Sequence, residues 1–296
     1  MEIALFNRHA RSLIKDVCLT HTQLNILLSD FRKLKVHALS NVDYDILRFL
    51  ITMCDKSDIG RLRNAKISFT QENHGVCLLD IVISTDNLGL VKVIFKLTCK
   101  KDLSNFLSRS WIWQHVKSGE MCTFLMGRRS VLISKIVCSM NCATMACAYC
   151  DPLIFCIEQN NFVAAKAMIE YRPEMCYVLG PKRRYPIYIL LNVVIKQHDH
   201  VDIPSFYELF EVILKHSIPF TSNGTTVNCV GLLIYRNSVY YALRINNLLQ
   251  ESYLIDVILK NGYQPSRYDL MGAAEFGLYE DFVKLFSVYY GSCRVP

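Results

Sequence analysis

The sequence has few charged residues, few glycines and prolines, and no long apolar run. Only 20% of the 296 residues are charged and 52% are hydrophobic, which excludes an intrinsically disordered chain. Twelve glycines and eight prolines are few for this length, and this scarcity favours helices that are largely buried. A membrane-spanning helix needs about 20 mostly apolar residues, and every apolar run here is shorter or interrupted by polar residues. No transmembrane helix and no secretory signal are therefore expected.

Motifs that carry catalytic chemistry are also missing. The chain has no Gly-rich phosphate loop, no Gly-x-Ser-x-Gly nucleophile elbow and no His-Glu-x-x-His zinc motif. His198 and His200, with Asp199 between them, could bind a metal ion in a loop, but an exposed polar segment is the better interpretation because structural sites need about four ligands. We predict a protein that is not an enzyme and that needs no cofactor.

What the sequence does contain is a repeated layout of two short helices joined by a polar turn. Asp151–Glu170 has a proline at the start of its first helix and the turn Gln159-Asn160-Asn161. Cys77–Phe95 repeats this layout in register, with Leu third, apolar residues sixth and seventh, the turn ninth to eleventh, and Lys sixteenth. A helix-turn-helix unit that recurs in register predicts an all-α, helical-repeat solenoid.

Further helix pairs are expected near residues 110, 185, 238 and 268. In the pair near 110, Gly119 is expected in the turn, and in the pair near 185 an insertion over Val193–Phe206 is expected to form a loop. Gly262 and Gly277 stand where helices should end on a left-handed residue. The predicted organisation is a helical N-terminal cap or divergent repeats over residues 1–70, followed by a repeat array over 71–296 with units near 77, 110, 151, 185, 238 and 268.

These residues resemble the ankyrin repeat family, whose pattern is Thr-Pro-Leu-His, two small residues, a Gly turn and a Val-Val-Lys-Leu-Leu-Leu helix. Asp151-Pro152-Leu153 and Val163–Lys166 match this pattern closely, whereas Tyr185-Pro186-Ile187 and Leu259–Gly262 match parts of it. Most units lack the Thr and His that fasten the first helix, and two carry insertions. The resemblance covers residues 75 to 290. It implies an ankyrin-like solenoid with short hairpin loops, acting as a scaffold or adaptor that binds proteins through its hairpin tips and the concave face of its first helices.

Thirteen cysteines are many for a chain of this length, and five of them lie close together. Cys147 and Cys150 have the two-residue spacing of zinc knuckles, so the alternative function is a zinc-stabilised nucleic-acid-binding or redox module centred on Cys138–Cys156. Its candidate ligands are Cys138, Cys142, Cys147 and Cys150. Because free cysteine is often fully buried, close packing of this segment against a neighbouring helix is the favoured interpretation.

The net charge of +7 is unevenly distributed. Three basic clusters each follow an expected second helix, and stacked repeats would align them along one edge as a surface for a partner protein with an acidic surface. Ordinary solubilisation is the alternative explanation. Nucleic acid is disfavoured because no aromatic residues interleave with the clusters. We expect a monomer that is located in the cytoplasm, with the nucleus as the alternative location. The candidate partner-binding residues are Lys100, Lys101, Arg128, Arg129, Lys182, Arg183 and Arg184.

Overall fold

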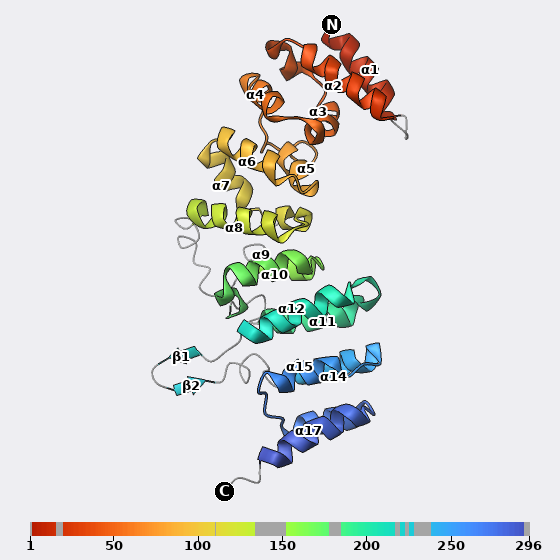
Figure 1. The fold of residues 1–296 in the computed structure, drawn as a ribbon, viewed down its shortest axis with the longest axis vertical. Helices are drawn as coiled ribbons and strands as arrows, with labels where there is room; N and C mark the ends of the chain where they lie inside the picture. The colour runs from red at the N-terminus through yellow and green to blue at the C-terminus, as the bar shows by residue number, and fades with distance from the viewer. Residues whose placement is uncertain are drawn as a thin grey trace. The chain divides into compact units, whose positions relative to one another are not determined.

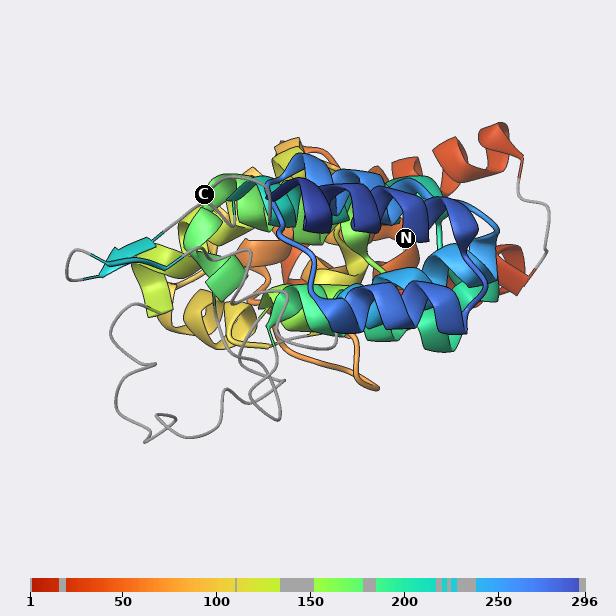
Figure 2. The ribbon, with the colours of Figure 1, turned by 90° about the horizontal axis from the view of Figure 1, so that it is seen from below.

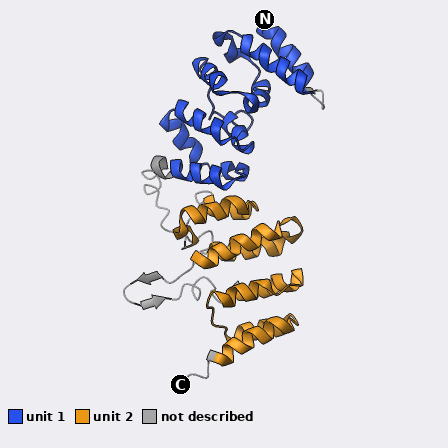
Figure 3. Cartoon of the chain, in the orientation of Figure 1, with its two compact units in different colours: residues 1–137 blue, residues 138–296 orange. Residues whose placement is uncertain are grey.

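The computed structural model describes residues 2–15, 20–109, 111–133, 152–177, 185–216, 220–222, 225–227 and 238–292. Helices dominate these residues, which confirms the predicted all-helical class. The only strands in the described ranges are β1 (Phe220–Ser222) and β2 (Thr225–Val227), which pair antiparallel. None of the described helices combines the length and the apolarity needed to cross a membrane. The chain divides into two compact units, residues 1–137 and residues 138–296 (Figure 3).

In the first unit, successive helices pack in pairs. Contacts join α1 to α2, α5 to α6 and α7 to α8, while α3 packs against both α1 and α5, and α4 packs against α6. The elements are α1 (Ile3–Lys15), α2 (His21–Lys33), η1 (Val36–Asn41), α3 (Tyr44–Leu50), η2 (Ile51–Met53), α4 (Lys56–Asn64), α5 (Leu78–Ser84), α6 (Leu88–Leu97), α7 (Lys100–Leu107), η3 (Trp111–His115) and α8 (Gly119–Ile133), where η marks a 3-10 helix.

The second unit repeats one packing arrangement four times. Pairs form between α9 and α10, α11 and α12, α14 and α15, and α16 and α17; the first helices contact one another in order, and so do the second helices. Seen from below, these helices fall into two rows (Figure 2). The elements, labelled in Figure 1 where there is room, are α9 (Pro152–Glu158), α10 (Phe162–Tyr171), η4 (Pro173–Tyr177), α11 (Pro186–Gln197), η6 (His198–His200), α12 (Ile203–His216), α14 (Ser238–Leu249), α15 (Tyr253–Lys260), α16 (Arg267–Glu275) and α17 (Tyr279–Ser292).

The two segments that share a layout in the sequence also share a turn geometry. Asp86 and Asn160 occupy the same place in that layout, and each has a φ of +57°. The asparagine that follows each of them caps the next helix: the Asn87 side chain accepts a hydrogen bond from the Leu90 N–H (3.0 Å), and the Asn161 side chain accepts one from the Ala164 N–H (3.2 Å). The predicted helix pairs and their polar turns are confirmed at both places.

Two predicted glycine turns are confirmed in the second unit. Gly262 follows α15 with a φ of +83°, and Gly277 follows α16 with a φ of +68°. Beside the second turn, Ala273 is buried whereas Ala274 is exposed. Gly272 allows α16 to approach α14 closely, because a Cβ at this position would lie 3.3 Å from Leu243 Cδ1 on α14.

Two sequence predictions about loops are wrong. The expected insertion over Val193–Phe206 is mostly helix, because α11 continues to Gln197 and α12 begins at Ile203. The apolar periodicity of Val193 and Val194, both buried, extends the helix past the expected break. Gly119 begins α8 and is not a turn residue, and the segment before it forms the 3-10 helix η3, which packs against α5.

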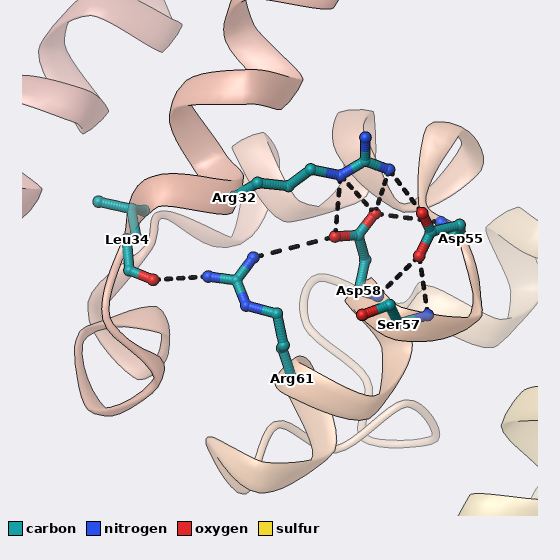
Figure 4. A network of polar contacts seen from close by, with 6 residues as sticks. All are labelled: Arg32, Leu34, Asp55, Ser57, Asp58 and Arg61. Atoms are coloured by element: carbon teal, nitrogen blue, oxygen red, sulfur yellow. Dashed lines mark hydrogen bonds and ion pairs between the residues drawn. The ribbon is translucent and has the colours of Figure 1, made fainter.

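A polar network ties α2 to α4 in the first unit (Figure 4). The Asp58 carboxylate, only 2% exposed, accepts hydrogen bonds from Arg32 at 2.7 and 3.1 Å. Arg32 also reaches Asp55 (2.9 Å), and Arg61 donates to the Leu34 carbonyl oxygen (2.5 Å). The contacts hold the two helices by charge as well as by apolar packing.

Candidate partner-binding surface

The structure places four of the seven predicted binding residues in helices. Lys100 and Lys101 lie exposed in the first turn of α7; on α8, Arg128 is exposed and Arg129 half-buried. Lys100 and Lys101 follow the second helix α6 as expected, but they lie in a helix and not in a loop. The expectation is wrong for Arg128 and Arg129, which lie inside α8. The α7 helix starts three residues after α6 ends, and α8 runs on past its arginines to Ile133. Lys182, Arg183 and Arg184 lie outside the described residues.

A local start signal explains why the chain resumes a helix at Lys100. The Cys99 sulfur caps α7 by accepting a hydrogen bond from the Asp102 N–H (3.4 Å). Asp102 also puts a negative charge in the first turn, where the helix dipole favours it and where two lysines alone would be unfavourable.

Basic residues are concentrated in the segment that runs from the start of α6 to the end of α8. Residues 88–133 contain eight Lys and Arg but only two Asp and Glu, so this short stretch has a charge of +6 out of the +7 of the whole chain. The clusters singled out from the sequence account for only half of these cations. The others are Lys92, Lys96, Arg109 and Lys117.

Phe124 on α8 brings two of these cations together. The Lys92 Nζ atom, from α6, lies 5.8 Å from the centroid of the Phe124 ring, and the Arg128 Cζ atom lies 5.3 Å from it. The Phe95 ring meets Phe124 edge-on at a centroid distance of 5.2 Å. Cation–π contacts of this kind contribute about 0.5–1 kcal/mol at exposed sites, enough to favour the observed side-chain positions. The ring therefore joins the basic faces of α6 and α8 into one surface.

The cations of this surface have no carboxylate partners among the described residues. No described carboxylate oxygen lies within 4.0 Å of the charged nitrogens of Lys92, Lys96, Lys100, Lys101 or Arg128. Arg109 differs, because it forms an ion pair with Glu72 at 2.7 Å. We call Lys92, Lys96, Lys100, Lys101 and Arg128, with the Phe124 ring, the basic surface.

Sequence reasoning did not identify Lys92, Lys96 and Phe124 as members of one site. One signal was available, because Lys92 occupies the sixteenth position of the repeated layout, equivalent to Lys166. The equivalent lysine behaves differently, since Lys166 forms an ion pair with Glu208 on α12 at 2.7 Å. The Phe124 contact depends on α6 packing next to α8, which no local pattern predicts.

The four candidate zinc ligands cannot be placed in the structure. Cys138, Cys142, Cys147 and Cys150 lie outside the described residues. Within the described ranges, no group of three or more His, Cys, Asp or Glu could hold a metal ion. His198 contacts Asp199 at 3.1 Å, with both side chains substantially exposed, in a single 3-10 turn.

The cysteines that the structure describes in the helix pairs are mostly buried. Cys77, Cys122 and Cys156 are fully buried. Burial raises the pKa of the Cys122 thiol to about 12 and also raises the pKa of Cys77. A thiol with a raised pKa stays protonated and is a poor nucleophile or metal ligand at neutral pH.

Comparison with protein-family models, curated proteins and solved structures finds no match for this chain.

Proposed function

We propose that this protein is a non-enzymatic, helical-repeat scaffold or adaptor of the ankyrin type that binds other proteins. The observation that carries the proposal is the pattern of helix contacts in the second unit. Through four successive pairs, first helices pack against first helices and second helices pack against second helices. Each pair buries its apolar face against its neighbours, as a repeat protein requires. Preorganised helices can present side chains to a partner at a small ordering cost.

Exposed side chains on the first helices of the second unit support the expected role of these helices in binding a partner. Tyr240 on α14 is 38% exposed, and on α16 Met271 and Tyr268 are 57% and 79% exposed. Aromatic residues and Met are enriched at protein interfaces. The basic surface of the first unit offers a second region, one that suits an acidic partner.

The buried free cysteines support a reducing compartment, and we place the protein in the cytoplasm. Cys54, Cys77 and Cys176 are buried thiols. Proteins of the cytosol keep such thiols reduced.

Affinity capture from an extract of the expressing cells, followed by reconstitution of the complex from purified components, tests the proposal. We expect a protein partner that binds the folded chain in a fixed stoichiometry. The matched control is Leu190→Asp, which puts a charge at a fully buried position of α11 and should unfold the second unit. Recovery of no protein partner, or equal recovery by the unfolded control, would contradict the proposal.

A further inference from the structure

We infer that Lys92 and Arg128, which contact the Phe124 ring, and Lys96, one turn from Lys92 on α6, form a binding site for an acidic segment of a partner protein. The inference rests on the proposed function and deepens it, since it assigns the residues and the chemistry of one contact.

The spacing of the cations suits carboxylates arranged on a helix. Lys92 and Lys96 lie one turn apart on α6, and side chains at this spacing are about 5–6 Å apart on a helix surface. Phe124 and Arg128 are one turn apart on α8, and the ring contact with Lys92 brings the two rows together. Glutamates one turn apart on a partner helix have the same repeat. An acidic helical segment could therefore meet both rows at once.

The charge at this site is left uncompensated by the described part of the chain. Lys92, Lys96 and Arg128 are all exposed, and no described carboxylate lies within 4.0 Å of their charged nitrogens. Elsewhere in the first unit, exposed arginines such as Arg11 and Arg32 pair with aspartates. Like charges held around one ring repel one another, and binding of carboxylates would relieve that repulsion.

Other polyanions suit this surface less well. Single-stranded nucleic acid would need open aromatic faces for base stacking, but the Phe124 ring is already in contact with two cations and with Phe95. An anionic membrane surface would be met by basic residues together with apolar side chains that insert. Among residues 88–109 and 111–129, whose side chains the structure describes, Trp111 is the only exposed large hydrophobic side chain, at 37%.

The test measures binding of a fluorescent peptide with glutamate at every fourth position, using the full chain and fluorescence anisotropy. We expect affinity at low salt that falls as the ionic strength reaches the physiological range, where the Debye length is about 8 Å. The triple variant Lys92→Glu, Lys96→Glu and Arg128→Glu should weaken binding by about tenfold or more. The same three residues changed to Gln should weaken it less, and circular dichroism checks that both variants are folded.

A matched control changes the net charge equally in the second unit, at Lys196→Glu, Lys215→Glu and Lys260→Glu, which are all exposed. We expect it to weaken binding by less than about threefold because the charges lie outside the site. Equal weakening by both triple variants, or tighter binding of duplex DNA or of anionic vesicles than of the peptide, would overturn the inference. If a partner is captured from extract equally well by the wild type and the Glu variant, the inference is wrong and the proposed function stands. If the wild type captures no partner, the proposed function fails.

Discussion

At the residue scale, Asp58 shows how much this helical chain relies on a few buried carboxylates. Its side chain is 2% exposed and lies between Arg32 on α2 and Arg61 on its own helix, which approach it to 2.7 and 3.9 Å. A buried charge is stable only when it is paired and hydrogen-bonded, so removal of one partner costs more than the pair contributes. The packing of α2 on α4 should therefore be sensitive to Arg32.

Arg32→Met is expected to lower the free energy of unfolding of the first unit by about 2–4 kcal/mol, because Asp58 stays buried without its closest cation. Urea denaturation followed by circular dichroism measures the change. Lys33→Met on the same helix is the control. The Lys33 side chain, which forms a 2.9 Å ion pair with Asp30, is 65% exposed, and loss of this pair should cost less than about 1 kcal/mol. Equal losses in the two variants would contradict this account.

Asp281 is a second buried carboxylate, and its environment predicts a pH dependence. The Asn246 side chain donates to it at 2.9 Å and the Ser252 hydroxyl also donates to it, yet burial raises the pKa of Asp281 above the ordinary value of 3.8. The folded state therefore binds this proton more tightly than the unfolded state does. The stability contributed by protonation is fully present below pH 3.8 and is lost as the pH rises through the raised pKa.

Asp281→Asn places a neutral side chain at this position at every pH. The stability of the wild type relative to this variant is therefore expected to fall as the pH rises above 3.8. Urea denaturation of both proteins over the acid range gives this difference. A difference that stays constant with pH would show that burial does not control the ionisation of Asp281.

At the element scale, three of the described helices begin with the same arrangement of an aspartate that accepts a backbone hydrogen bond. The backbone N–H before each helix donates to an aspartate at the third helical position: Asp55 to Asp58 (3.2 Å), Cys77 to Asp80 (2.9 Å) and Ser266 to Asp269 (2.7 Å). These aspartates also bring negative charge to the positive end of the helix dipole. This arrangement fixes the start of helices that lack the Thr and His of the ankyrin pattern.

Gly277→Ala is expected to lower the free energy of unfolding of the second unit by about 1 kcal/mol or more, because alanine is strained at a φ of +68°. Gly60→Ala in α4 provides the contrast, since it is helical and a Cβ there would meet nothing within 4 Å. That change should stabilise the first unit by about 0.5–1 kcal/mol. Thermal and urea denaturation of both variants check the signs, and destabilisation by Gly60→Ala would contradict the assignment.

Much of the helical layout could be predicted because its signals are local. Pro152 and Pro186 mark helix starts, Asn87 and Asn161 mark caps, and Gly262 and Gly277 mark left-handed turns. The pairs at 77, 151, 185, 238 and 268 therefore follow from short patterns. The signals weaken where tertiary packing decides the outcome. The 3-10 form of Trp111–His115 is one such case, because this segment packs against α5, a neighbour that the local sequence does not reveal.

The candidate surface could be predicted only in part for the same reason. Lys100, Lys101 and Arg128 were identified from their clustering, and all three are exposed cations. The link between α6 and α8 requires that Phe124 pack beside Phe95, a contact between residues far apart in the chain. Side-chain contacts of this kind follow from how helices stack and leave no local pattern.

At the scale of the whole molecule, some regions contain lysines that form ion pairs between helices, whereas the lysines of the basic surface have no such partner among the described residues. In the second unit, Lys166 pairs with Glu208 and Lys284 pairs with Asp256, and each ion pair bridges successive second helices. Tyr207 and Tyr253 add hydrogen bonds to glutamates between α12 and its neighbour. On the basic surface of the first unit the described cations have no carboxylate partner among the described residues, so their charge is available to another molecule.

The most direct test of the account is hydrogen–deuterium exchange of the full chain, free and saturated with the acidic partner segment. Binding should slow exchange in peptides from α6, the start of α7 and α8, because these elements carry the basic surface, and should leave α9–α17 unchanged. The Lys92→Glu, Lys96→Glu and Arg128→Glu variant should lose this protection. Protection confined to α9–α17, or equal protection in the wild type and the variant, would contradict the account.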